Sequence, residues 1–279
     1  MVATVSIIAF FMFGKNLSSL LKNKMSQKIF QDQVAIVTGA GQGIGFEICR
    51  QLALQGAFVL LNDVDKKLTA IAVDKIKSEA GHCIGIAGDA ADVVFINEMV
   101  KFAAEKYGKL NIAIANAGIT LFADFFEYSP AAFEKVMQLN LGGSFFLAQS
   151  AARQMKQQGT GGSILFMSSV VGHQAHKNLA AYAITKAGLE MLAKNLVIEL
   201  SPYQINVNAI APGATLTERT IDDAEYEKTW SRITPIGKPA TTADIANAAL
   251  FLVSPLAKHI TGQSLIIDGG WTSVSPSPY

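Results

Sequence analysis

The sequence predicts an α/β fold in which a doubly wound, seven-stranded parallel sheet carries helices on both faces. From residue 33 onward, short apolar runs alternate with longer amphipathic segments. The runs are almost continuously apolar, which is typical of parallel strands that are buried on both faces. No internal repeat or Pro/Ser-rich linker interrupts this alternation. We therefore expect residues 29–279 to form one domain.

Each expected strand is followed by a segment with helical periodicity. The strands are expected at residues 34–37, 58–61, 83–86, 110–115, 164–167, 205–210 and 264–267. The helices are expected at residues 44–55, 66–80, 92–107, 130–157, 179–200 and 243–253. Residues 213–240 are polar and show no strand pattern, so we expect a lid over a binding site there.

Composition excludes several classes of protein. Half of the 279 residues are apolar or aromatic and 16% are charged, which provides a large core and excludes intrinsic disorder. A net charge of +1 argues against a nucleic-acid partner. The two cysteines, Cys49 and Cys83, cannot form a disulfide framework, and no Cys/His cluster has zinc spacing. We expect no metal site and a cytoplasmic location.

Residues 1–28 are expected to be an apolar leader or extension. The uncharged run 2–13 is shorter than the ~20 residues of a membrane-spanning helix. It also lacks the basic region that precedes the apolar part of a secretory signal. We prefer a dispensable extension ahead of Met25, and the alternative is a weak membrane anchor.

A glycine-rich turn joins the first expected strand to the first helix. Its pattern is Thr38-Gly39-x-x-x-Gly43-x-Gly45, with Gln42 and Ile44 inside it. Glycines at such a turn let a pyrophosphate approach the backbone, and the helix N-terminus offers free N–H groups to the anion.

An acidic residue, Asp63, ends the second strand about 20 residues after Gly43, where a carboxylate binds the ribose 2′-hydroxyl of a dinucleotide. The same carboxylate would repel a 2′-phosphate, so NAD is favoured over NADP. The neighbouring Lys66 and Lys67 keep NADP as an alternative.

Three further residues suggest proton chemistry. Tyr182 and Lys186 are four residues apart in a helical pattern and therefore share one face. Ser169 follows the strand at 164–167, and parallel sheets bind their ligands at the carboxyl ends of their strands.

These motifs together resemble the single-domain branch of the short-chain dehydrogenases/reductases, over residues ~30–272 of a Rossmann-type sheet. The additional motifs are Asn116-Ala117-Gly118, Asn140 in Leu-Asn-Leu-Gly, Pro212-Gly213-x-x-x-Thr217 and the C-terminal Thr261-Gly-Gln…Asp268-Gly-Gly270. Two departures are mild: Ala115 stands where the family often has Asn, and Gly88-Asp89-Ala90 replaces the usual Asp-Val.

The resemblance implies the roles of the site residues. Tyr182 would exchange the hydroxyl proton, Lys186 would stabilise its phenolate and bind the nicotinamide ribose, and Ser169 would hold the substrate oxygen. Asn140 would hold a water that relays the proton. The implied cofactor contacts are Gly39, Gln42, Gly43, Ile44, Gly45, Asp63, Asp89, Ala90, Asn116, Ala117, Gly118, Tyr182, Lys186, Pro212, Gly213, Thr215 and Thr217.

The resemblance also implies a function: NAD-dependent interconversion of a secondary alcohol and a ketone by hydride transfer. We lean to sugar or polyol substrates, as in glucose 1-dehydrogenase-like members, and 3-oxoacyl thioesters and steroid-like alcohols are alternatives. His173 is a further candidate substrate contact, and the aromatic stretch 122–128 either walls the pocket or is buried in the core. A homo-tetramer or dimer is expected by analogy. A non-catalytic NAD-binding regulatory protein on the same fold is the alternative of another class.

Overall fold

The computed structural model describes residues 28–275 and contains the expected seven-stranded parallel sheet. The strand order is β3–β2–β1–β4–β5–β6–β9. The strands are β1 (Val34–Val37), β2 (Phe58–Asp63), β3 (His82–Ala87), β4 (Ile112–Ala115), β5 (Gly162–Met167), β6 (Ile205–Pro212) and β9 (Ser264–Ile267). Strands β2 and β3 lie on one side of β1, and β4 and the later strands lie on the other side. This reversal of the strand order places a ligand crevice at the carboxyl ends of β1 and β4. The predicted fold class is confirmed.

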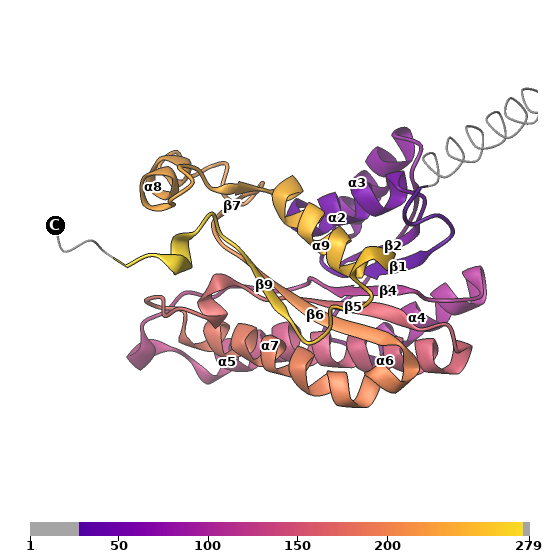
Figure 1. The fold of residues 1–279 in the computed structure, drawn as a ribbon. Coiled ribbons are helices and arrows are strands. Elements are labelled where there is room, and N and C mark those ends of the chain that lie inside the picture. Colours follow the sequence, from indigo (N-terminus) through magenta and orange to yellow (C-terminus); the bar gives the residue numbers. More distant parts are fainter. Residues whose placement is uncertain (1–27, 276–279) are drawn as a thin grey trace, which may run out of the picture.

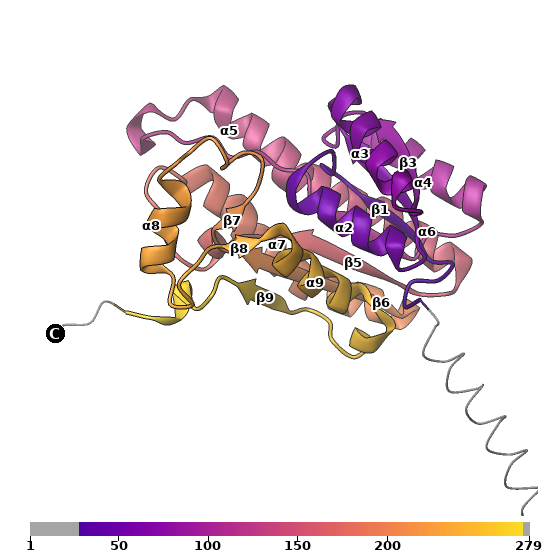
Figure 2. The ribbon, with the colours of Figure 1, turned by 90° about the horizontal axis from the view of Figure 1, so that it is seen from above.

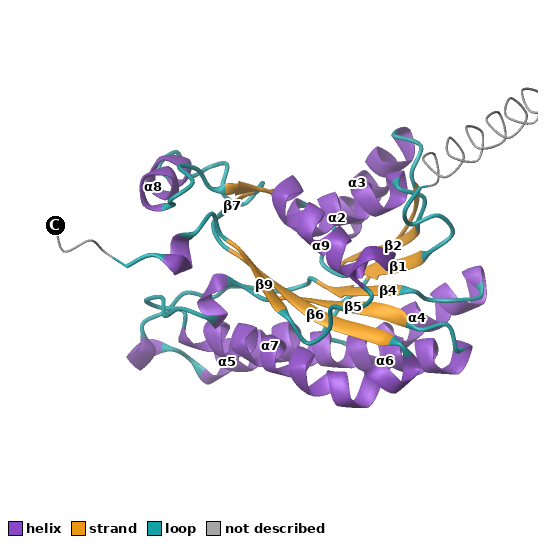
Figure 3. Ribbon diagram, viewed as in Figure 1, coloured by secondary structure: helices purple, strands orange, loops and turns teal. Residues whose placement is uncertain are grey.

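Helices cover both faces of this sheet (Figures 1 and 3). One layer contains α2 (Gly43–Leu54), α3 (Lys66–Ser78) and α9 (Thr242–Val253), and the other contains α4 (Val93–Tyr107), α6 (Ser144–Gln158) and α7 (Ala180–Leu200). The first strand shows why its sequence is continuously apolar. Ala35 and Val37 belong to the core on the α2 side, and Val34 and Ile36 belong to the core on the α6 side.

The helix expected at 130–157 is interrupted in its first half. It consists of α5 (Pro130–Val136), the π-helical segment η2 (Met137–Gly143) and α6. Asn140 lies in this π-helical segment and is fully buried. Its side chain accepts a hydrogen bond from the Ile119 N–H and donates one to the Ile119 carbonyl, both at 2.9 Å. Single π turns inside α-helices often occur at functional sites.

The expectation that residues 213–240 contain no strand is wrong. Two short strands, β7 (Thr215–Leu216) and β8 (Ala240–Thr241), pair in parallel, and α8 (Tyr226–Ile233) lies between them. Figure 2 shows α8 standing beyond the end of the main sheet, beside β7 and β8. The Tyr226 phenol oxygen accepts a hydrogen bond from Thr215 N at 3.3 Å, and burial raises the pKa of this phenol. The segment is thus folded against the end of β6.

The expected leader, residues 1–28, lies outside the described residues except for Lys28. Within residues 28–275 no helix has both the length and the apolar character needed to cross a bilayer.

Candidate active site at the carboxyl ends of the strands

A cavity of about 690 Å³ opens where β1, β2 and β4 end. The predicted site residues that line it are Gly39, Gln42, Gly43, Ile44, Gly45, Asp63, Asp89, Ala90, Asn116, Ala117, Gly118, Tyr182, Lys186 and Thr217. Another cavity, of about 720 Å³, lies at the opposite end of the sheet and contains none of the predicted site residues. The chemistry suggested by the sequence therefore converges on the first cavity.

Two glycines of the turn, Gly39 and Gly45, are packed too closely to accommodate a side chain. Gly39 has a φ of +61°, and a Cβ there would lie 2.6 Å from the Cα of Ala117. A Cβ on Gly45 would lie 2.5 Å from Nδ2 of Asn116. That amide donates hydrogen bonds to the carbonyls of Thr38 (2.9 Å) and Gly39 (2.8 Å), which fastens the end of β4 to the turn. The glycines thus bring the backbone at the start of α2 to the cavity wall, where its free N–H groups can bind an anion.

The Asp63 carboxylate is already oriented by the backbone around it. Its Oδ2 accepts a hydrogen bond from Gly41 N at 2.9 Å, and its Oδ1 accepts one from Asp65 N at 3.0 Å. The side chain lies at the cavity wall beside the glycine turn. Asp63 therefore presents a fixed negative charge next to the expected pyrophosphate seat.

Asn62 is a cavity residue that the sequence reasoning missed. Its Nδ2 donates to the carbonyls of Ile86 and Gly88, both at 3.0 Å, which fixes the orientation of the amide. Among the described residues its Oδ1 is a buried side-chain oxygen with no hydrogen-bond partner. A buried acceptor without a partner is costly, and a bound ligand that donates a hydrogen bond would satisfy it. The one available signal was an Asn at the end of an otherwise apolar strand.

Tyr182 and Lys186 project from α7 toward the same cavity. The ammonium Nζ of Lys186 lies 5.3 Å from the centroid of the Tyr182 ring. It donates a hydrogen bond to the carbonyl of Met167 at 2.6 Å. Lys186 is only 3% exposed, so its charge acts in a poorly solvated environment. The geometry thus holds one fixed cation beside one phenol.

Ser169 and Asn140 do not line the cavity but lie against residues that do. Ser169 is two residues beyond Met167, the last residue of β5, and its Oγ accepts a long hydrogen bond from Val171 N at 3.4 Å. Asn140 and Lys186 both approach Gly118, because a Cβ built there would lie 3.3 Å from Asn140 Oδ1 and 3.6 Å from Lys186 Nζ. All four predicted catalytic residues are therefore gathered around one end of the sheet.

Other predicted contacts are not at the cavity wall. Pro212, Gly213 and Thr215 lie behind it at the end of β6, where Gly213 N donates to the carbonyl of Ile267 at 2.9 Å. His173 does not line the cavity, and its Nε2 lies 2.9 Å from the Glu190 carboxylate.

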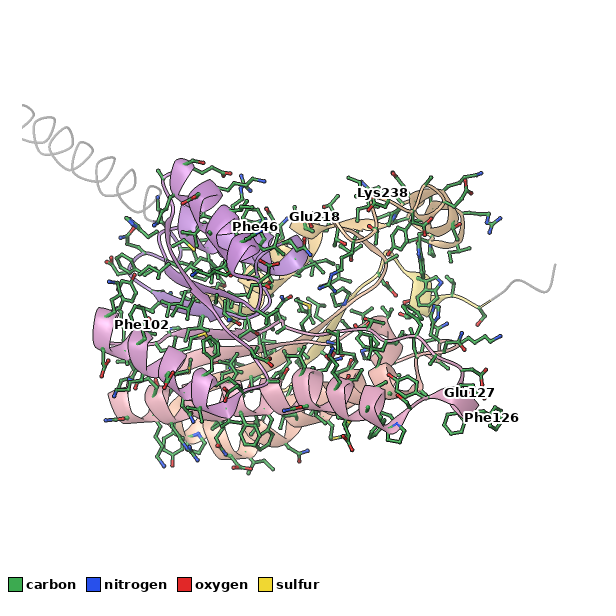
Figure 4. The ribbon with its side chains drawn as sticks, turned by 180° about the vertical axis from the view of Figure 1, so that it is seen from behind. Phe46, Phe102, Phe126, Glu127, Glu218 and Lys238 are labelled. Carbon is green, nitrogen blue, oxygen red and sulfur yellow. The ribbon has the colours of Figure 1, made fainter. Side chains whose placement is uncertain are left out.

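The aromatic stretch 122–128 is not buried in the core. Phe122, Phe125 and Phe126 are 68%, 75% and 90% exposed. Figure 4 shows Phe126 and Glu127 at the tip of the segment that precedes α5. Buried packing, one of the two alternatives for this stretch, is therefore wrong for these three rings.

Further cavity residues come from segments that are distant in sequence. Met167, Ile119, Thr120, Glu218 and Arg219 also line it. Glu218 lies beside the start of α2 (Figure 4), with Oε2 3.7 Å from the position of a Cβ on Gly43. Glu218 and Arg219 reach the cavity because residues 213–240 fold back beside the glycine turn, which no sequence spacing shows. Among the described residues no cluster of three His, Cys, Asp or Glu side chains could hold a metal ion.

Known proteins resemble this chain over most of its length. Residues 39–272 match a family model described as enoyl-(acyl carrier protein) reductase. An L-rhamnose 1-dehydrogenase (NAD(P)(+)) of Azotobacter vinelandii is 35% identical, over 86% of this chain and 96% of the relative. A 7alpha-hydroxysteroid dehydrogenase of Escherichia coli K12 is 36% identical, over 85% and 92%. A crystal structure of a short-chain type dehydrogenase/reductase from Mycobacterium marinum superimposes with a TM-score of 0.83 at 29% identity, covering 88% of this chain and 99% of that one.

Proposed function

Because this chain belongs to the short-chain dehydrogenase/reductase family, it is an NAD(P)-dependent oxidoreductase of CH–OH groups, and we propose that Tyr182 is its catalytic acid and base. The observation that carries the proposal is the buried Lys186 ammonium held 5.3 Å from the centre of the Tyr182 ring, at the wall of the cavity. A positive charge beside the ring would stabilise negative charge that develops on the Tyr182 oxygen during proton transfer, because the site is poorly solvated. Tyr182 would take the proton of a secondary alcohol as the phenolate, and would return a proton to the ketone oxygen as the phenol.

The residues around the cavity fit a dinucleotide. The bare backbone of the glycine turn would receive the pyrophosphate, the Asp63 carboxylate would bind the adenosine ribose hydroxyls, and the unpartnered Asn62 oxygen would accept a hydrogen bond near the adenine side. Asp63 supports NAD as the preferred cofactor. When bound, the nicotinamide would accept or supply the hydride.

The remaining catalytic residues have positioning and proton-transfer roles. The hydrogen bond from Lys186 to the Met167 carbonyl fixes the ammonium, which leaves its other N–H groups to bind the nicotinamide ribose. Ser169 would donate to the substrate oxygen at the end of β5. Asn140, in the π-helical segment, would hold a water that connects Lys186 with solvent.

For the substrate we propose a sugar or polyol. The rhamnose dehydrogenases support it, and the 7alpha-hydroxysteroid dehydrogenases support a steroid-like alcohol as second candidate. The side chains that meet at the lid, His176, Trp230 and Trp271, have ring centroids 5.3–6.5 Å apart. Aromatic faces of this kind suit the apolar face of either molecule.

We also propose that residues 29–279 act as one domain in a cytoplasmic homo-oligomer, a tetramer or dimer. An apolar groove of about 630 Å³ on α5, η2 and α6 supports the assembly. It is lined by Phe133, Phe145 and Phe146 among others, and these side chains are partly exposed. Exposed apolar patches of this kind often mark subunit contacts.

The test is an absorbance assay at the reduced-nicotinamide band. Purified protein is mixed with NAD or NADP and a panel of aldoses, polyols and hydroxysteroids, and Tyr182→Phe serves as the inactive variant. We expect turnover of at least one panel member, and loss of turnover in Tyr182→Phe with cofactor affinity changed less than about threefold, because the ring remains. Cofactor binding without turnover of any member would instead indicate a non-catalytic binding protein.

A further inference from the structure

A buried carboxylate lies one helical turn beyond Lys186 on α7. Glu190 is 8% exposed and does not line the cavity. Its Oε1 accepts a hydrogen bond from Ser168 Oγ at 2.6 Å, and the same oxygen lies 2.9 Å from His173 Nε2. One oxygen atom therefore connects two residues that enclose Ser169.

The segment between these two residues rests directly on α7. Ser168 Oγ is also 3.0 Å from the carbonyl of Lys186. Gly172 packs so tightly that a Cβ there would lie 2.8 Å from Glu190 Oε1. His173 Nε2 is in addition 3.4 Å from Ser264 Oγ on β9. The turn that carries Ser169 is thus enclosed between α7 and the edge strand.

The Ser169 backbone is held by a hydrogen bond from Gly172 N to its carbonyl at 2.9 Å, but its hydroxyl is only weakly restrained. Its backbone is extended, with φ of −165°, and within residues 28–275 its Oγ makes a single hydrogen bond, the long 3.4 Å contact with Val171 N. Hydrogen bonds to a charged acceptor are shorter and stronger than neutral ones. The two contacts of Glu190 are therefore the strongest side-chain restraints on this turn.

We infer that Glu190 is a positioning residue, which sets the location of the Ser169 hydroxyl by binding Ser168 and His173 on either side of it. The inference rests on the proposed function, because it assigns Ser169 to the substrate oxygen. It also gives His173 a role as a partner of Glu190 on the far side of the turn. A purely structural role for Glu190 is a weaker explanation. The free-energy cost of removing a buried carboxylate from water offsets much of the stability that its hydrogen bonds give the folded protein.

The experiment compares Glu190→Ala and Glu190→Gln with wild type. Loss of the carboxylate removes the side-chain restraints on the turn, and misplacement of a reacting group by about 1 Å costs up to about 100-fold in rate. We expect Glu190→Ala to lower kcat about tenfold or more, with the Kd for NAD changed less than twofold, because the cofactor contacts remain. Glu190→Gln keeps an oxygen for the Ser168 hydroxyl and should retain at least a third of kcat. Glu199→Ala, an exposed glutamate on the same helix, is the matched control and should behave like wild type.

A double-mutant cycle identifies Ser169 as the residue through which Glu190 acts. In a Ser169→Ala background, Glu190→Ala should lower the residual kcat less than threefold. A full additional tenfold loss in that background would show that Glu190 acts elsewhere and would overturn the inference. An equal loss of kcat in Glu190→Gln would overturn positioning by hydrogen bonding.

Amide hydrogen exchange over residues 168–174 tests the same inference without turnover. The exchange rate of this segment should rise at least tenfold in Glu190→Ala and remain unchanged in Glu199→Ala. Unchanged exchange in Glu190→Ala refutes the inference even if the enzyme is active. Lack of turnover in the wild-type protein would refute the proposed function. The hydrogen-exchange result would then still test whether Glu190 holds the turn at residues 168–174. If Glu190→Ala does not fold, His173→Asn is measured in its place with the same expected directions.

Discussion

Asp63 provides the sharpest test of cofactor choice. In the wild-type protein, Asp63 Oδ2 accepts a hydrogen bond from Gly41 N at 2.9 Å. Replacement by Asn removes the negative charge but keeps the size of the side chain and one oxygen that can accept this hydrogen bond. The glycine turn should therefore keep its shape. The change isolates the charge that we expect to repel a 2′-phosphate.

The size of the effect follows from Coulomb's law. Two unit charges about 4 Å apart interact by about 4 kcal/mol at an effective dielectric near 20. Asp63 is only partly buried, so screening by solvent and salt lowers this to about 2 kcal/mol. Because about 1.4 kcal/mol corresponds to a factor of ten, the preference for NAD over NADP should fall about 30-fold in Asp63→Asn.

The assay is the ratio of kcat/KM for NAD to kcat/KM for NADP, measured with one substrate. Asp65→Asn is the control, since it makes the same charge change two residues later, where Asp65 Oδ1 caps α3 by accepting from Lys67 N at 2.7 Å. Its ratio should stay within about threefold of wild type, because the capped carboxylate points at α3. An unchanged ratio in Asp63→Asn, or an equal change in both variants, would refute the assignment of Asp63 as the selector.

Two further predictions concern Lys186 and the cysteines. Lys186→Ala should lower kcat about 100-fold and weaken cofactor binding in a titration, because the ammonium acts on the Tyr182 phenol and also binds the nicotinamide ribose. A loss of kcat with unchanged cofactor affinity would contradict the proposed ribose contact. Burial raises the pKa of the Cys83 thiol to about 12 and that of the Cys49 thiol well above its usual value, so neither should react with a thiol reagent at mildly alkaline pH until the protein is unfolded. Rapid labelling of the native protein would contradict the core positions of both residues.

Much of the fold was predictable because a strand buried on both faces needs apolar residues throughout. The run from Val34 to Val37 shows this, since its alternate residues enter two different cores. The π-helical turn was not predictable from local spacing, and Asn140 within it bonds to the backbone of Ile119, which is 21 residues away. The β7–β8 pair was missed because two-residue strands are too short to show any alternation.

The candidate site was predictable where its parts are close in sequence. The glycine turn is one local motif, and Tyr182 and Lys186 are neighbours on one helical face. Glu218 reaches the cavity only because residues 213–240 fold back over it. Asn62 is recognised as a candidate ligand contact only because its buried Oδ1 has no hydrogen-bond partner among the described residues. Neither has a signature in residue spacing.

The strand order has a consequence for synthesis of the chain on the ribosome. The first strand, β1, is an interior strand of the sheet and pairs with β2 on one side and β4 on the other. The Val34 N–H meets the side chain of Asn111, which is 77 residues further along. At about 5–20 residues per second, translation of this stretch takes roughly 4–15 seconds. Throughout that interval one border of the nascent sheet has unpaired backbone groups, so intermolecular strand pairing competes with correct folding until β4 emerges.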